Sequence, residues 1–181
     1  MIEVTVRGIS MTEAGFVVLL KGDSDERALP IAIGSAEAQA ILFELNGMEF
    51  PRPLTHDLFR NVLSELGVSL IKVEINELRD ETFFATLHLG AQEGRVIEMD
   101  ARPSDALALA LRCTAPVHVA DGVMAAAGIL VDKGDAHASK GADAPADPVS
   151  DLRGRLQKAI SEERYEEAAR LRDRLRALSG K

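Results

Sequence analysis

Two short stretches of the sequence place an Arg-Pro pair, a hydroxyl side chain and an acid within a few residues of one another. The first is RPLTHD at 52–57, and the second is RPSD at 102–105. Each precedes an apolar segment with helical spacing, so its Pro is favourable near the helix start and its Thr or Ser is a candidate cap. The acid then falls in the first turn, where the helix dipole favours negative charge. We expect the two helix starts to assemble one cluster of acids and arginines on an otherwise apolar scaffold.

A third motif precedes these two and gives the chain a family resemblance. The segment 29–38 reads LPIAIGSAEA, and it is followed by RPLTHD at 52–57 and DARPSDA at 100–106. With the three motifs in this order, the chain resembles the bifunctional nuclease domain family over residues 1–131. The resemblance implies a nuclease that hydrolyses the phosphodiester bonds of DNA and RNA with low sequence specificity.

Hydrolysis of a phosphodiester bond requires an activated water molecule, stabilisation of charge at the phosphorus and help for the leaving oxygen. Two or more carboxylates that hold Mg²⁺ or Mn²⁺ can supply all three, so we expect one of these cations as a cofactor. The candidate metal ligands are Asp100, Asp105, Asp57 and Glu37. The candidate catalytic residues are Asp100, Asp105, His56 as a general acid or base, and Arg102 and Arg52 as phosphate contacts.

The same residues also have a purely structural interpretation. Glu37, Asp57 and Asp105 each fall in the first turn of an expected helix, where an acid is favourable without any function. Arg52 and Arg102 could pair with these acids and tie the helix starts together. Both interpretations of the cluster stay open at the level of the sequence.

The charge distribution argues against simple binding of nucleic acid by the larger part of the chain. The net charge is −8, and it divides into −11 for residues 1–150 and +3 for residues 151–181. An acidic surface repels phosphates, and the chain has no Trp, one Tyr and six Phe with which to stack bases. A nuclease of this composition needs a metal ion that inverts the local field, or a locally basic site.

The composition is that of a globular protein, with 46% hydrophobic and 28% charged residues. No apolar run approaches the roughly 18–20 residues of a membrane span, and the N-terminus lacks the pattern of a signal peptide. Cys113 is the one cysteine, which we expect to be buried and inert, and His88 is expected at the surface. These features predict a cytoplasmic protein without membrane contact.

Apolar periodicity predicts an α+β fold, in which a largely antiparallel sheet packs against helices. The segments 68–78, 82–89 and 95–100 alternate as three strands of an antiparallel meander. Further strands are expected at 2–6, 16–20, 28–33 and 116–119. Helices are expected at 35–46, from Thr55 to Leu66, from Ser104 onward and at 121–127.

The composition changes after Val131. Residues 132–149 have no periodicity and almost no large apolar side chain, which predicts a flexible linker. Residues 150–181 read as a helical hairpin, and 159–173 resemble the UVR motif of the excision-repair proteins UvrB and UvrC. A hairpin of this size has too little core to be stable alone, so its apolar stripe predicts a partner, either a second copy or another protein. The expected partner-binding residues are Tyr165, Ala168, Ala169, Arg172 and Leu175.

Two functions of different classes follow from these observations. The first is a metal-assisted nuclease with nucleic acid as its substrate, which the family resemblance and the polar cluster favour. The second is a non-catalytic, homodimeric scaffold whose UVR-like hairpin docks a repair or protein-quality-control partner, which the acidic core favours. In both cases we expect the core domain to form a homodimer.

Overall fold

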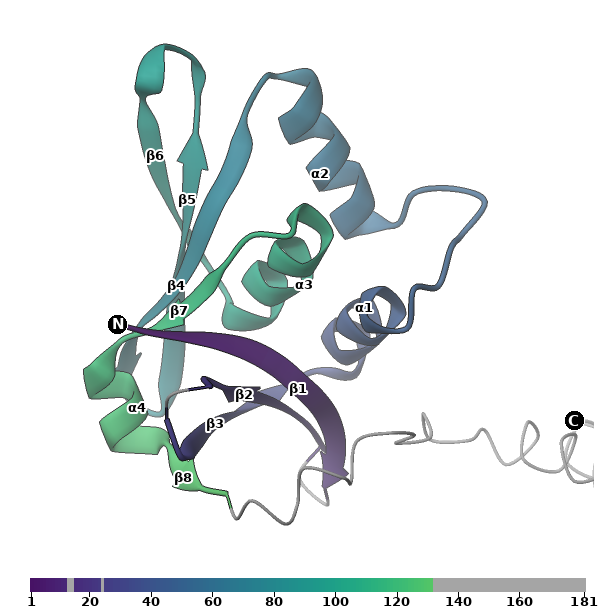
Figure 1. Cartoon of the computed structure of the whole chain (residues 1–181). Helices are drawn as coiled ribbons and strands as arrows, with labels where there is room; N and C mark the ends of the chain where they lie inside the picture. Colours follow the sequence, from purple (N-terminus) through teal and green to yellow (C-terminus); the bar gives the residue numbers. More distant parts are fainter. Residues whose placement is uncertain (13–14, 24, 132–181) are drawn as a thin grey trace, which may run out of the picture. The chain divides into compact units, whose positions relative to one another are not determined.

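The computed structural model describes residues 1–12, 15–23 and 25–131. Within them, eight strands form one sheet in the order β6-β5-β4-β7-β1-β2-β3-β8 (Figure 1). The pairing is antiparallel between all neighbours except β4 and β7, which run parallel. The strands are β1 (Ile2–Thr12), β2 (Gly15–Lys21), β3 (Arg27–Ile33), β4 (Ser69–Arg79), β5 (Thr82–Gly90), β6 (Val96–Ala101), β7 (Val117–Val119) and β8 (Ile129–Leu130).

Four α-helices and one short 3₁₀ helix complete this part of the chain. They are α1 (Ser35–Leu45), α2 (Thr55–Glu65), α3 (Pro103–Cys113), α4 (Asp121–Ala127) and the 3₁₀ helix η1 (Gln92–Gly94). Helix α3 is central, because it contacts α1, α2, β4 and β5 (Figure 1). The predicted α+β fold with a largely antiparallel sheet is therefore confirmed. The predicted linker and helical hairpin, 132–181, lie outside the described residues.

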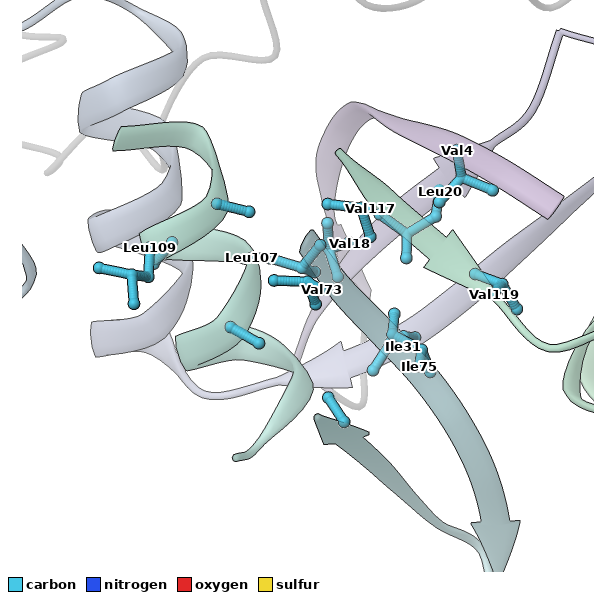
Figure 2. Packing of buried hydrophobic residues seen from close by; sticks show 14 of the residues in the cluster. Val4, Val18, Leu20, Ile31, Val73, Ile75, Leu107, Leu109, Val117 and Val119 are labelled. Atoms are coloured by element: carbon cyan, nitrogen blue, oxygen red, sulfur yellow. The ribbon is translucent and has the colours of Figure 1, made fainter. Parts of the chain in front are cut away.

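The position of α3 follows from its sequence. Its alternating Ala and Leu residues, ALALAL at 106–111, make it apolar on almost every side, and most of its residues are buried. A helix that is apolar all round is stable only inside a core. Figure 2 shows Leu107 beside Val73 of β4, a strand that α3 contacts, while Leu109 points to another side of the helix. The small Ala side chains between the Leu residues allow neighbouring elements to approach α3 closely.

The helix caps differ from the prediction by one or two residues. Thr55 and Ser104, predicted as caps, lie inside their helices as the first residue of α2 and the second of α3. The capping positions are occupied by Leu54 and Arg102, whose side chains form no capping hydrogen bond. At α2, the Asp57 carboxylate accepts the N–H of Leu54 instead, so the acid of the motif satisfies a free donor at the helix start.

Candidate functional site

The first turns of three helices converge in one polar cluster. Glu37 is the third residue of α1, His56 the second of α2 and Asp105 the third of α3, and Arg102 immediately precedes α3. Pro103 fixes the direction in which the chain enters α3, and it needs no N–H partner at that position. We call the four side chains Glu37, His56, Arg102 and Asp105 the Arg102 cluster.

The members of the Arg102 cluster form a continuous chain of contacts. The Nε atom of Arg102 donates to Oδ2 of Asp105 at 2.6 Å, and its Nη1 atom lies 2.9 Å from Oε1 of Glu37. The other carboxylate oxygen of Asp105, Oδ1, lies 3.3 Å from Nε2 of His56. Arg102 therefore bridges α1 and α3, and Asp105 connects α3 to α2.

The cluster is open to solvent at its cation. The Arg102 side chain is 66% exposed, whereas those of His56 and Glu37 are about a fifth exposed, 19% and 20%. Burial raises the pKa of Asp105, but hydrogen bonds from Arg102 and His56 outweigh it and lower the pKa below its usual value. The hydrogen bond to Asp105 in turn raises the pKa of Arg102. An ionised carboxylate thus faces one edge of the His56 ring.

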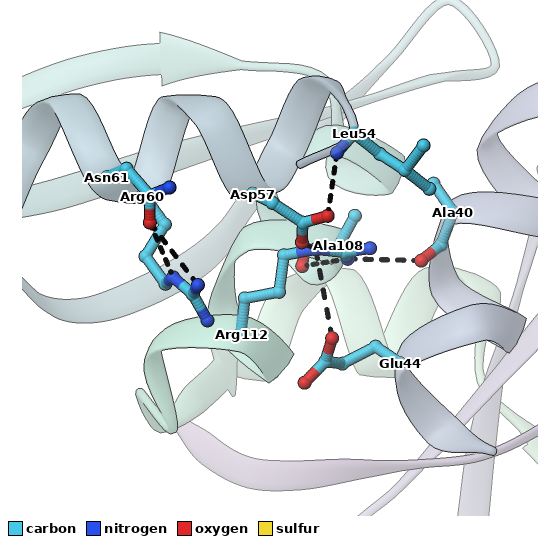
Figure 3. Close-up of polar contacts among 8 residues, drawn as sticks. All are labelled: Ala40, Glu44, Leu54, Asp57, Arg60, Asn61, Ala108 and Arg112. Atoms are coloured by element: carbon cyan, nitrogen blue, oxygen red, sulfur yellow. Dashed lines mark hydrogen bonds and ion pairs between the residues drawn. The ribbon is translucent and has the colours of Figure 1, made fainter. Parts of the chain in front are cut away.

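Asp57 does not join this cluster, although it follows His56 directly. Its Oδ1 atom accepts a hydrogen bond at 2.6 Å from Nε of Arg112, at the end of α3 (Figure 3). Its Oδ2 atom accepts the Leu54 N–H at 2.9 Å. Sequence reasoning missed Arg112, and the one signal for it is a cation within an otherwise apolar helical segment.

Two other predicted site residues also lie apart from the Arg102 cluster. Asp100 is exposed on β6, opposite Thr86 of β5, and it alternates with Ala101, which packs against the core. The Asp100 side chain therefore lies on the face of the sheet opposite to the one on which Ala101 packs against the core. Arg52 is exposed in the connection between α1 and α2, without a side-chain hydrogen bond or ion pair to the residues that the structure describes.

The carboxylates as arranged do not fit a divalent cation. In the described part of the chain, no group of three or more His, Cys, Asp or Glu residues is placed to hold a metal ion. Arg102 faces both Glu37 and Asp105, and Arg112 faces Asp57, so each predicted ligand except Asp100 already neutralises a guanidinium. The expected Mg²⁺ or Mn²⁺ ion stays a prediction.

The expectation of a surface location for His88 is wrong. His88 is 9% exposed, and its Nε2 atom lies 2.9 Å from Oε2 of Glu74. Neighbouring strands on both sides of β5 place acids against the ring, since Nδ1 lies 3.7 Å from Glu98. Alternation along one strand reveals the face on which a residue lies but not the side chains from adjacent strands that cover it. Cys113, expected to be buried, is only partly buried, and burial raises the pKa of its thiol.

The predictions for the C-terminal part lie outside the described residues. This applies to the partner-binding set Tyr165, Ala168, Ala169, Arg172 and Leu175. Among the helices in the described ranges, none has both the length and the apolar character needed to cross a membrane.

Comparison with known proteins connects the site to a family. The model of the bifunctional nuclease domain matches residues 18–132, which include every member of the Arg102 cluster, and the model of the UvrB/uvrC motif matches residues 147–181. An uncharacterised protein of Mycobacterium tuberculosis (strain H37Rv) is 46% identical over 124 residues, which cover 68% of this chain and 73% of that protein.

Plant proteins resemble the chain over a longer stretch at lower identity. Bifunctional nuclease 1 of Oryza sativa subsp. indica is 27% identical over 176 residues, which cover 88% of this chain and 53% of the plant protein. Bifunctional nuclease 2 of Arabidopsis thaliana is 27% identical over 177 residues, covering 88% and 54%. The chain thus spans about half the length of these plant proteins. Because the domain model matches more than half of the residues of this chain, the chain belongs to the bifunctional nuclease domain family.

Proposed function

We propose that the protein is a nuclease that hydrolyses phosphodiester bonds of DNA and RNA at the Arg102 cluster. The observation that carries the proposal is the His56–Asp105 contact of 3.3 Å directly beside an exposed arginine. Membership of the bifunctional nuclease domain family and the names of the plant relatives support it. In this proposal Asp100 has no catalytic role, since its side chain lies on the other face of the sheet.

The proposed chemistry uses His56 as the general base. If Nε2–H of the neutral ring donates to Asp105, the lone pair is on Nδ1, where it can accept a proton from an attacking water molecule. The water oxygen forms a bond to phosphorus, the bond between phosphorus and the leaving oxygen breaks, and that oxygen takes a proton from solvent. Asp105 fixes the ring tautomer and stabilises the imidazolium that forms, as a carboxylate does beside a catalytic histidine.

Arg102 is the proposed phosphate contact. Its Nε and Nη1 atoms face Asp105 and Glu37, and among residues 1–12, 15–23 and 25–131 its Nη2 atom donates to no partner, in a side chain that is largely exposed. The guanidinium can bind a non-bridging phosphate oxygen by a charge-assisted hydrogen bond. The nearby first turns of α1, α2 and α3 add N–H groups and positive dipole ends to the same region. With His56 neutral, the cluster carries one positive and two negative charges, so in this proposal the exposed edge of Arg102 and the helix N-termini, rather than an excess of basic side chains, attract the phosphate.

A cleavage assay on highly purified full-length protein tests the proposal. Labelled single-stranded and double-stranded DNA and RNA are incubated with the wild type, His56→Asn, Arg102→Met and the matched control Arg7→Met. Arg7 is suitable because it is also exposed and paired with an acid, Asp23, in a different part of the protein. We expect His56→Asn to lower the rate by at least about a hundredfold, as is typical of general-base removal. Equal cleavage by wild type and His56→Asn would contradict the proposal.

The same assay tests the predicted divalent cation. Reactions with EDTA, and with EDTA followed by excess Mg²⁺ or Mn²⁺, show whether cleavage depends on the metal. Restoration by either ion would support the predicted cofactor. The ion would then be held in one of two ways: Glu37 and Asp105 would release Arg102 and bind the ion, or a phosphate oxygen of the substrate would complete the ligand set. Cleavage that persists in EDTA would remove the cofactor from the proposal and leave the roles of His56 and Arg102 intact.

A second candidate function is the non-catalytic, dimeric scaffold. It is favoured by the large hydrophobic side chains that are exposed around α2, since such patches mark interaction sites. They are Leu45, Met48, Phe50, Leu58, Phe59, Val62 and Leu66. This candidate predicts self-association without cleavage, and the cleavage assay therefore separates the two functions.

A further inference from the structure

The guanidinium of Arg112 is buried near the end of α3. Its side chain is 2% exposed, although a charged group is costly to bury unless it is paired and hydrogen-bonded. Arg112 meets this requirement. Its Nε atom donates a hydrogen bond to the Asp57 carboxylate at 2.6 Å, and its Nη1 atom donates to the carbonyl oxygens of Ala40 at 3.0 Å and Ala108 at 2.9 Å (Figure 3). The Glu44 carboxylate lies 3.8 Å from Nε.

These partners belong to three different helices. Ala40 and Glu44 lie on α1, Asp57 on α2 and Ala108 on α3, so one side chain joins all three. Asp57 also accepts the N–H of Leu54 at the start of α2. The Arg112–Asp57 pair thereby fixes the first turn of α2, and His56 is the residue before Asp57.

Helix α2 has few other buried contacts that could fix its position. Leu63 is the one buried residue between Thr55 and Glu65, and the stripe Leu58, Val62 and Leu66 is exposed. A helix held by so little apolar burial depends strongly on its polar contacts. Burial raises the pKa of Asp57, but Arg112 and the Leu54 N–H outweigh it and lower the pKa, so Asp57 faces Arg112 as a carboxylate.

We infer that Arg112 is a positioning residue of the Arg102 cluster: through Asp57 it holds the start of α2 so that His56 meets Asp105. The inference rests on the proposed function for its catalytic consequence. Its structural part does not, because the contact between His56 and Asp105 can be observed without substrate. Arg112 itself lies outside the Arg102 cluster and touches none of its members by a hydrogen bond or ion pair among the described residues.

The test combines spectroscopy with kinetics on the full-length protein. The variants are Arg112→Met, Arg112→Lys and Asp57→Asn, and Glu44→Gln is the matched control because it removes an acid near Arg112 that lies on α1. Ring ¹⁵N chemical shifts of His56 report its tautomer and its hydrogen bond to Asp105. We expect Arg112→Met and Asp57→Asn to shift these signals and to lower kcat at least tenfold with a smaller change in KM. Arg112→Lys should restore part of both, and Glu44→Gln should leave both unchanged.

Each outcome bears on the inference. Unchanged His56 signals in a folded Arg112→Met protein would overturn it. If Arg112→Met does not unfold cooperatively, Asp57→Asn decides, because it retains an oxygen acceptor at the helix start, and unchanged His56 signals in that variant would overturn the inference equally. A wild-type protein that cleaves no nucleic acid would refute the proposed function alone, since the spectra still show whether Arg112 sets the position of His56.

Discussion

The Nε2 atom of His56 lies 3.3 Å from Oδ1 of Asp105, although 49 positions separate the two residues in the sequence. The contact joins the first turn of α2 to the first turn of α3, and Arg102 holds the opposite oxygen of the same carboxylate. Asp105 is therefore shared between a ring that can move a proton and a cation that can bind phosphate. This shared carboxylate gives the cluster a pH dependence that stability measurements can detect.

Replacement of Asp105 by Asn should destabilise the protein near neutral pH and have little effect in acid. The pKa of Asp105 is lowered in the folded protein, so the stability that its ionised form contributes is present above the ordinary value of about 3.9 and is lost as the pH falls through the lowered folded value. Urea unfolding of wild type and Asp105→Asn from neutral to acidic pH measures this difference. The control is Asp80→Asn in the exposed β4–β5 turn. A difference that stays constant over this range would show that the carboxylate is not held ionised by Arg102 and His56.

Gly34 permits the position of Glu37. A Cβ atom at residue 34 would lie 2.3 Å from Oε2 of Glu37, so Gly34→Ala should displace that carboxylate and release Arg102 from α1. The backbone φ of Gly34 is −74°, which Ala adopts without strain. The effects of Gly34→Ala and Glu37→Gln on unfolding free energy and on KM should therefore be non-additive in the double variant. Additive effects would mean that Glu37 keeps its contact with Arg102 when Ala occupies position 34.

Much of the fold could be predicted from periodicity, because alternation along β4 and β5 and the Ala/Leu pattern of α3 determine which faces are buried. The Arg102 cluster was partly predictable, because His56 and Asp105 each directly follow the hydroxyl residue of a matching helix start, although Arg52, the counterpart of Arg102, lies apart from the cluster. The partners of individual charges were not predictable. Asp57 and Glu37 have similar sequence contexts, but one pairs with Arg112 and the other with Arg102. That choice depends on how α1, α2 and α3 pack, which no local pattern specifies.

Removal of the Glu74 carboxylate should destabilise the sheet. The Glu74 carboxylate accepts a hydrogen bond from His88, which is 9% exposed, and a second one at 2.5 Å from Nζ of Lys72. Both hydrogen bonds lower the pKa of Glu74, and the one from Lys72 has the larger effect. Glu74→Gln leaves a buried imidazole without its charged acceptor, at a cost of about 1–3 kcal/mol. Chemical denaturation at neutral pH measures the loss. Glu77→Gln is the control on the same strand, because its pair with Arg79 is exposed and should contribute less than about 1 kcal/mol.

The C-terminal segment is predicted to associate through its apolar stripe. A charge placed in that stripe by Ala169→Asp should weaken association by several kcal/mol if the stripe is buried in an interface, since the new carboxylate would have no partner there. Size-exclusion chromatography with light scattering and pull-down of bound proteins compare Ala169→Asp with wild type. Unchanged profiles and unchanged partners would show that residues 150–181 do not associate in this way.

Self-association of the core should involve α2. Leu58, Val62 and Leu66 follow one another at intervals of four residues, and their exposed fractions are 56%, 45% and 64%. Two copies of α2 that cross antiparallel at Val62 would place Leu58 of one copy against Leu66 of the other, so the stripe is complementary to itself under two-fold symmetry. Sedimentation equilibrium of the wild type should therefore show a dimer, and Val62→Glu should raise its dissociation constant at least about tenfold, which corresponds to about 1.4 kcal/mol.

Ser64→Glu separates the effect of the apolar stripe from that of added charge. Ser64 is exposed on α2, and two positions along a helix correspond to roughly the opposite side from Val62. Ser64→Glu adds the same negative charge to α2 as Val62→Glu does, so the electrostatic repulsion between two acidic copies should rise equally in both variants. A dimer that weakens with Val62→Glu but not with Ser64→Glu would place the interface on the stripe. If both variants weaken it alike, overall charge controls association, and if neither does, the core associates through another surface or remains monomeric.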